Sequence, residues 1–186
     1  MHKYLPKIYF FINELNINNI KNINKKIAII YRNYHKKPLI TEIKKFKNFC
    51  KKTNRKFLIS NHPNLAFKLD LDGVYIPSFN KKYNIKNYVY KKNFLIIGSA
   101  HNLKEIKIKE KQGVEQIFLS PLFKVRKNKN YFDVIKFNFL SHMTKLPIIA
   151  LGGISTQNIK KIKMTNSYGF ASISFIKDGN KIPNLN

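Results

Sequence analysis

The chain has 186 residues, 44% of them hydrophobic, and its formal net charge at pH 7 is +27. This length predicts a single domain, residues 1–186, with a sizeable core, and no run of eighteen apolar residues indicates a membrane span. A basic excess favours nucleic-acid binding, but the lysines are spread along the whole chain and no nucleic-acid-binding motif accompanies them. We therefore expect a cytoplasmic protein with solvated lysine-rich faces, and neither a membrane nor a nucleic acid as its partner.

Apolar runs typical of buried strands recur along the chain, with helix-like segments between them. The strands are predicted at residues 7–13, 27–32, 57–60, 73–76, 94–97, 117–119, 148–151 and 170–175. The helices are predicted at residues 39–53, 102–112, 132–144 and 155–164. Eight strands in alternation with helical segments indicate an α/β fold, a (β/α)8 TIM barrel, with a doubly wound parallel sheet as the alternative.

The chain is short for an eight-stranded barrel, so its helices are expected to be trimmed. Only residues 176–186 follow the predicted eighth strand, which is too few for a full closing helix. We expect a truncated last helix that leaves the barrel incompletely covered, or a gap filled by a second copy in a homo-oligomer. The single cysteine, Cys50, lies in a predicted helix and is expected to pack in the core.

Two neighbouring strand ends carry glycines and hydroxyl groups. The apolar run at 147–151 ends in Gly152 and Gly153, and Ser155 then opens an amphipathic segment that it is expected to cap. A second group, Ala171 to Ser174, ends the next predicted strand. Backbone N–H groups at such turns suit a phosphate, and barrels of this type hold phosphates after their last two strands. An ordinary strand-to-helix turn remains the alternative.

Ordered blocks of sequence carry a resemblance to a known family. They are FLISN at 57–61, DGVY at 72–75, IGSAHNLKE at 97–105, SPLF at 120–123, IALGGIS at 149–155 and ASIS at 171–174. Together they resemble the thiamine-phosphate synthase/TenI family of (β/α)8 barrels. Synthases of this family are transferases of thiamine biosynthesis that couple hydroxymethylpyrimidine diphosphate to thiazole phosphate and release pyrophosphate. The resemblance therefore implies phosphorylated small molecules as substrates.

The resemblance also implies site residues. Ser99 and His101 match a Ser-x-His element beside the pyrimidine and the leaving group, and they are the candidate catalytic residues. The candidate ligands of the thiazole phosphate, which we call the phosphate anchor, are Gly152, Gly153, Ile173 and Ser174. The candidate ligands of the pyrimidine and pyrophosphate are Arg32, Asn61, Lys36 and Lys127. Of these, Lys36 lies out of register with the family, and Lys127 belongs to a basic loop that could equally be solvated.

The magnesium site of the family is not matched. His62 and Asn80 stand where the family has aspartates, and a neutral pair is a poor set of ligands for Mg²⁺. Magnesium is possible as a cofactor, but its usual ligands are missing. The leading interpretation is a synthase-like enzyme with a degenerate magnesium/pyrophosphate site. The alternatives are a TenI-like thiazole tautomerase, although Pro121 occupies the position of its histidine, or a non-catalytic barrel that binds a phosphorylated ligand.

Overall fold

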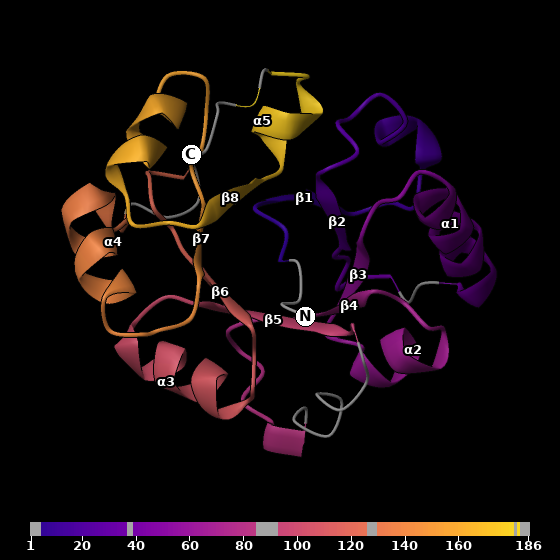
Figure 1. The fold of residues 1–186 in the computed structure, drawn as a ribbon, viewed down its shortest axis with the longest axis horizontal. Helices are drawn as coiled ribbons and strands as arrows, with labels where there is room; N and C mark the ends of the chain where they lie inside the picture. Colours follow the sequence, from indigo (N-terminus) through magenta and orange to yellow (C-terminus); the bar gives the residue numbers. More distant parts are fainter. Residues whose placement is uncertain (1–4, 37–38, 85–92, 126–129, 181, 183–186) are drawn as a thin grey trace.

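The computed structural model describes residues 5–36, 39–84, 93–125, 130–180 and 182. Eight parallel strands pair in chain order and the last pairs with the first, which closes a barrel (Figure 1). The strands are β1 (Ile8–Ile12), β2 (Ala28–Tyr31), β3 (Phe57–Ser60), β4 (Gly73–Ile76), β5 (Leu95–Ala100), β6 (Gln116–Leu119), β7 (Ile148–Leu151) and β8 (Gly169–Ser172). The predicted (β/α)8 barrel is confirmed, and the doubly wound sheet is excluded.

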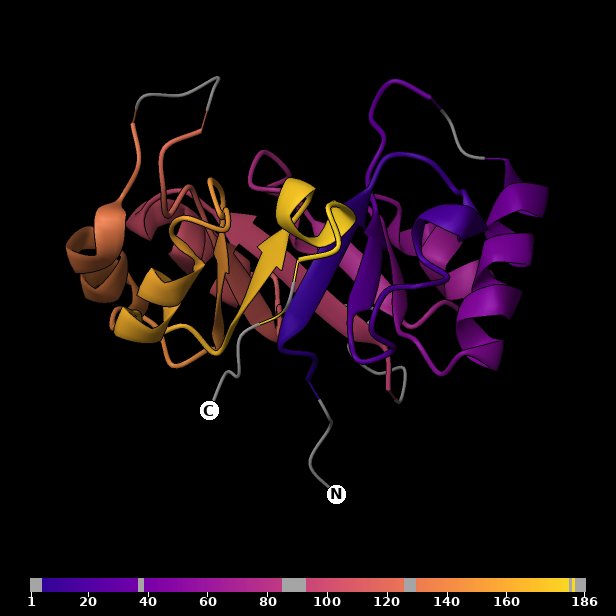
Figure 2. The ribbon, with the colours of Figure 1, turned by 90° about the horizontal axis from the view of Figure 1, so that it is seen from above.

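Helices surround the barrel but are short (Figures 1 and 2). They are α1 (Ile40–Lys52), α2 (Pro63–Lys68), α3 (Leu103–Lys111), α4 (Asp133–Ser141) and α5 (Ser174–Lys177), with 3-10 helices η1 (Ile17–Asn19) and η3 (Ile159–Met164). The trimmed helices and the truncated last helix agree with the prediction. Among the described residues, none of the helices combines the length and apolarity needed to cross a membrane.

The longest helix, α1, is amphipathic. Ile43, Phe46 and Cys50 lie on one side of it and are buried against the barrel. Burial raises the pKa of the Cys50 thiol to about 12, so this cysteine stays protonated at neutral pH. The thiol therefore acts as a small apolar group in the core, as expected.

Several predicted boundaries are wrong. No α-helix begins at Ser155, because the side chain of Asn158 accepts a hydrogen bond from the Ser155 amide and donates one to the Gly153 carbonyl. These bonds hold a turn, and only the 3-10 helix η3 follows it. The eighth strand ends at Ser172 instead of Phe175, since the Ser172 hydroxyl accepts from the Phe175 amide at the start of α5. The helix α2 was not expected.

The interior of the barrel is filled by side chains. Phe118 packs edge-on against three other rings, with centroids 4.8 Å from Tyr9, 5.9 Å from Phe11 and 5.5 Å from Tyr75. Such a barrel is a solid core, so ligands must bind outside it, at the edge where the parallel strands end. We call this edge the mouth of the barrel; in Figure 2, β7 and β8 point toward it and α5 lies beside it.

Candidate functional site

A buried tyrosine connects two of the predicted site residues at the mouth. Burial raises the pKa of Tyr75 on β4 to about 12, while hydrogen bonds with the side chains of Ser99 and Arg32 act in the opposite direction. The guanidinium carbon of Arg32 lies 4.5 Å from the centre of the Phe11 ring, in a cation–π contact. The fold therefore brings Arg32 of the β2 end and Ser99 of β5 to the same phenol.

A second polar cluster lies beside this one, after β3 and β4. The backbone amide of Asn61 donates to the backbone carbonyl of Tyr75 at 2.8 Å, which places the two clusters side by side. The Asn80 side-chain nitrogen donates to the Asn61 side-chain oxygen at 2.7 Å. The hydroxyl groups of Tyr34 and Ser60 are 3.1 Å apart. Asn61 has a φ of 60°, a left-handed conformation that asparagine tolerates better than most residues.

A hollow of about 690 Å³ opens beside this cluster. We call it the asparagine groove. Its described lining residues are Asn61, Pro63, Asn64, Phe79, Asn80, Lys81, Lys82 and Asn84. None of these residues is acidic, and residues 77–94 contain no Asp or Glu at all. The groove therefore offers amide donors and positive charge.

Magnesium does not fit this part of the site. The side-chain amide of Asn80 donates a hydrogen bond to the side chain of Asn61. His62, which precedes α2, is exposed. Within the described parts of the chain, His, Cys, Asp and Glu nowhere form a group of three or more that could hold a metal ion. Because Mg²⁺ prefers anionic oxygen ligands, the donors present suit an anion better than a cation.

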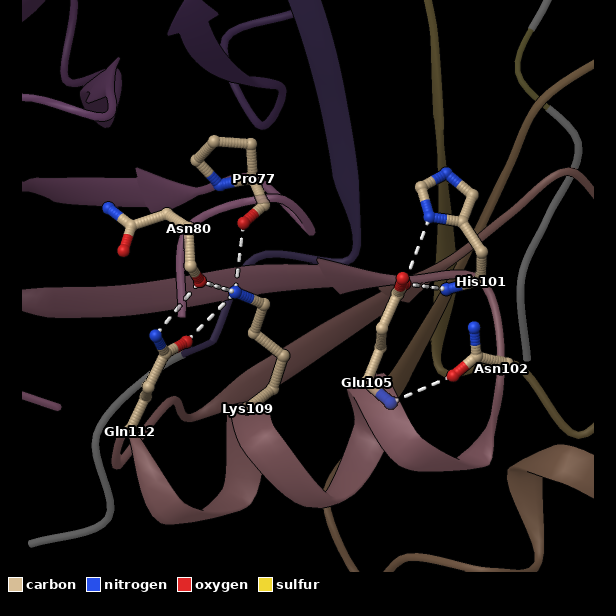
Figure 3. Close-up of polar contacts among 7 residues, drawn as sticks. All are labelled: Pro77, Asn80, His101, Asn102, Glu105, Lys109 and Gln112. Carbon is tan, nitrogen blue, oxygen red and sulfur yellow. Dashed lines mark hydrogen bonds and ion pairs between the residues drawn. The ribbon is translucent and has the colours of Figure 1, made fainter. Parts of the chain in front are cut away.

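His101 is held from one side by a carboxylate (Figure 3). Its Nδ1 atom lies 3.1 Å from the Glu105 carboxylate, which also accepts from the His101 amide at 2.7 Å. Asn102 in turn accepts from the Glu105 amide at 2.9 Å and caps α3. The His101 side chain is 47% exposed. A histidine oriented in this way through one ring nitrogen can exchange a proton through the other.

The phosphate anchor lies at the opposite side of the mouth. β7 and β8 are neighbours with Leu151 opposite Ala171, so the turns that follow them are adjacent. Gly152 and Gly153 have φ values of +95° and +69°. A Cβ atom on Gly153 would lie 2.5 Å from the carbonyl oxygens of Phe123 and Lys124. Because the loop after β6 packs so closely against this turn, only glycine fits at these two positions, whether or not a phosphate binds.

The remaining predicted residues are less enclosed. Ile173 and Ser174 are exposed at the start of α5, beside the glycine turn. Lys36 is exposed in a turn whose amides are held by the side chain of Asn33. Lys127 lies outside the described residues.

Sequence reasoning missed Lys109 on α3 and Gln112, which caps the end of that helix. Lys109 is fully buried and donates hydrogen bonds into the loop after β4. The only signal in the sequence was its position three residues after the apolar Ile106, on the face of α3 that packs on β5. Because each of the described α-helices carries at least one lysine, that signal did not stand out.

The fold and the mouth define a class of protein: a (β/α)8 barrel whose polar, carboxylate-poor mouth suits anionic ligands. Residues 20–176 match the family described as thiamine monophosphate synthase. The chain belongs to this family.

Two curated relatives show how far the similarity extends. The chain is 32% identical over 127 residues to a thiamine-phosphate synthase of Prochlorococcus marinus, covering 67% of this chain and 37% of the relative. It is also 32% identical over 136 residues to thiamine-phosphate synthase 1 of Streptococcus pneumoniae, covering 70% and 64%. The chain thus spans less than two thirds of the length of either relative.

A solved structure supports the fold. The thiamine phosphate pyrophosphorylase from Pyrococcus furiosus superposes with a TM-score of 0.72, covering 93% of this chain and 91% of that one. The sequence identity is 17%, so this similarity concerns the architecture alone.

Proposed function

We propose that the protein is a thiamine-phosphate synthase-like transferase that joins hydroxymethylpyrimidine diphosphate to thiazole phosphate in the cytoplasm. The observation that carries the proposal is the convergence of Arg32 and Ser99 on Tyr75, at the mouth of a barrel of this family. Both substrates are anionic, and the described residues at this mouth offer lysines, amides and a guanidinium group.

The proposed reaction replaces one bond of the pyrimidine methylene carbon by another. The bond from this carbon to the diphosphate oxygen breaks, and pyrophosphate leaves with the electron pair. The thiazole nitrogen then forms a bond to the same carbon. Positive groups aimed at the departing oxygen stabilise the charge that develops there.

Each predicted residue has a role in this scheme. Arg32 and Ser99 position the pyrimidine, and His101, oriented by Glu105, donates a hydrogen bond to the leaving group. Asn61 binds the pyrophosphate, with Lys36 and Lys127 as further sources of positive charge. The phosphate anchor (Gly152, Gly153, Ile173 and Ser174) holds the thiazole phosphate.

The test is direct. Purified protein is incubated with both precursors, with Mg²⁺ or with EDTA, and thiamine phosphate and pyrophosphate are measured. We expect the two products in equal amounts, and a large loss of both in Arg32→Met and Ser99→Ala. No product under either condition would contradict the synthase activity.

A non-catalytic barrel is the second candidate, favoured by the Asn61–Asn80 hydrogen bond, because the resemblance implies that Asn80 stands in place of one of the family's aspartates. In that case thiazole phosphate binds in a calorimetric titration although no product forms. Tautomerase activity would appear as conversion of one thiazole isomer into the other, and its loss in His101→Ala would assign the proton transfer to that residue.

A further inference from the structure

A buried cation lies under the loop that follows β4. The Lys109 side chain is 0% exposed, and its ammonium group donates to the carbonyl oxygens of Pro77 at 2.9 Å and Asn80 at 2.8 Å, and to the Gln112 side chain at 2.8 Å (Figure 3). A lysine has three donors, and here all three are used. All three acceptors are uncharged, so they solvate the positive charge without neutralising it.

Gln112 extends the same contact along the loop. Its side-chain nitrogen donates to the carbonyl oxygens of Asn80 and Lys82, at 2.9 Å each. Together the two side chains of α3 and its end hold three carbonyl groups of the segment 77–82. The loop is therefore attached to the helix by side chains, at the point where it forms one wall of the asparagine groove.

The barrel makes room for this lysine. A Cβ atom on Gly98 of β5 would lie 2.7 Å from the Cδ atom of Lys109, so any larger residue would displace the lysine stem. Burial lowers the pKa of Lys109 to about 8, with the nearby Glu105 acting in the opposite direction. The side chain is therefore still largely protonated at neutral pH.

Asn80 transmits this arrangement to the groove. Its carbonyl oxygen is held from below by Lys109 and Gln112, while its side chain donates to Asn61 on the groove side. The side-chain positions of the groove thus depend on a buried positive charge directly behind its wall. Such a charge adds to the potential of Lys81 and Lys82, and its effect is less screened than theirs because it is away from water.

We propose that the asparagine groove binds a diphosphate group without a divalent metal, and that Lys109 and Gln112 are the positioning residues that build it. The choice of diphosphate as ligand rests on the proposed function. Amide N–H groups and ammonium groups donate directly to phosphate oxygens, whereas a magnesium-bridged diphosphate needs carboxylates that the described groove does not contain.

The experiment is a calorimetric titration of inorganic pyrophosphate into the full chain, first in EDTA and then with Mg²⁺. We expect binding in EDTA that Mg²⁺ does not strengthen. In Lys109→Met the affinity should fall about tenfold or more, since a buried charge and two contacts to the loop are lost. The affinity for thiazole phosphate, at the opposite side of the mouth, should stay within about twofold.

Lys107→Met is the matched control. Lys107 lies on the same helix and carries the same charge, but its ammonium group contacts Glu110 and the Met143 carbonyl. We expect a change in pyrophosphate affinity of less than about threefold, because the half-exposed charge of Lys107 is screened by solvent. An equal loss of pyrophosphate affinity in both variants would show that the loss comes from net charge alone, and it would overturn the proposal.

Gln112→Glu keeps the proposal testable if Lys109→Met does not fold. It preserves the shape and the acceptor for Lys109, but it removes both donors to Asn80 and Lys82 and neutralises the buried charge. We expect weaker pyrophosphate binding in a folded protein. Unchanged affinity, or binding that requires Mg²⁺ in the wild type, would overturn the proposal.

The two proposals fail separately. If no thiamine phosphate forms but pyrophosphate binds in EDTA and depends on Lys109, only the synthase activity is wrong. If thiamine phosphate forms but pyrophosphate binds only with Mg²⁺, only the metal-free groove is wrong.

Discussion

The two sides of the barrel mouth are built by different means. On the side of β7 and β8, the anchor is a backbone structure, in which two glycines with positive φ pack against the loop after β6. On the side of β2 to β5, side chains form the site, through Tyr75, the Asn61–Asn80 pair and the buried Lys109. A backbone site tolerates many changes in side chains, whereas a side-chain site changes its chemistry with a few substitutions. The family resemblance implies such a difference here, since the glycine turn matches the family whereas His62 and Asn80 stand where the family is expected to have aspartates.

The largest effect is expected at the glycine turn. Gly153→Ala should lower the free energy of unfolding by about 3 kcal/mol, because a Cβ atom would clash with two carbonyl groups in a residue with positive φ. Urea unfolding measures this change. Gly179→Ala is the control, since Gly179 has a similar φ of +70° and nothing within 4 Å of its added Cβ, so only about 1 kcal/mol is expected. Equal losses would show that the close packing contributes nothing.

This clash also limits how the anchor can be tested. Gly153→Asp would be strained whatever it does to a phosphate, so a loss of binding in that variant would not identify the site. Ser174→Ala, at an exposed position beside the turn, is the cleaner probe of the anchor.

On the side-chain half of the mouth, Arg32→Met should lower kcat/KM for coupling about 100-fold, because it removes the guanidinium group near Tyr75 and keeps an apolar stem over Phe11. Steady-state kinetics with both precursors provides the measurement, and thermal unfolding checks that the variant is folded. A loss below about threefold would place Arg32 outside the reacting region.

A third prediction concerns His62 and Asn80, the positions at which the family resemblance implies aspartates. His62→Asp with Asn80→Asp should weaken pyrophosphate binding in EDTA about tenfold, because two negative charges are added beside the groove. Mg²⁺ should restore the affinity in this variant and have no such effect in the wild type. Calorimetry in both buffers measures the difference, and an unresponsive double variant would show that these positions do not face the ligand.

The smallest expected effect is a pH dependence due to Lys109. Its pKa is lowered to about 8 from 10.5, so between these values the unfolded chain binds the proton more tightly than the folded one. The contribution of Lys109 to stability therefore rises with pH through this window, by roughly 1 kcal/mol. The difference in unfolding free energy between wild type and Lys109→Met, measured at pH 7 and at pH 10, should shift in favour of the wild type at the higher pH. A pH-independent difference would contradict the burial of a charged ammonium group.

Local patterns predicted most of the fold. The eight apolar runs were identified as strands because each is short, apolar and bounded by polar segments, and all eight ended within three residues of the observed strand. The amphipathic α1 was identified from one stripe of apolar residues, of which Ile43 and Phe46 are buried. The prediction of a helix from Ser155 was wrong, because the Asn158 side chain competes for the backbone groups that a helix would use.

By itself, the sequence determined the barrel, since the hydrophobic pattern of each strand is a local property of the chain, and the family resemblance implied which residues could meet at the mouth. Only the tertiary structure decided that Gly153 is required by the loop after β6 and that Asn80 donates to Asn61. It also decided that Lys109, one lysine among many, is buried. The physical reason is that burial, close approach and hydrogen-bond partners are set by contacts between segments far apart in the chain, and a residue's type does not specify them.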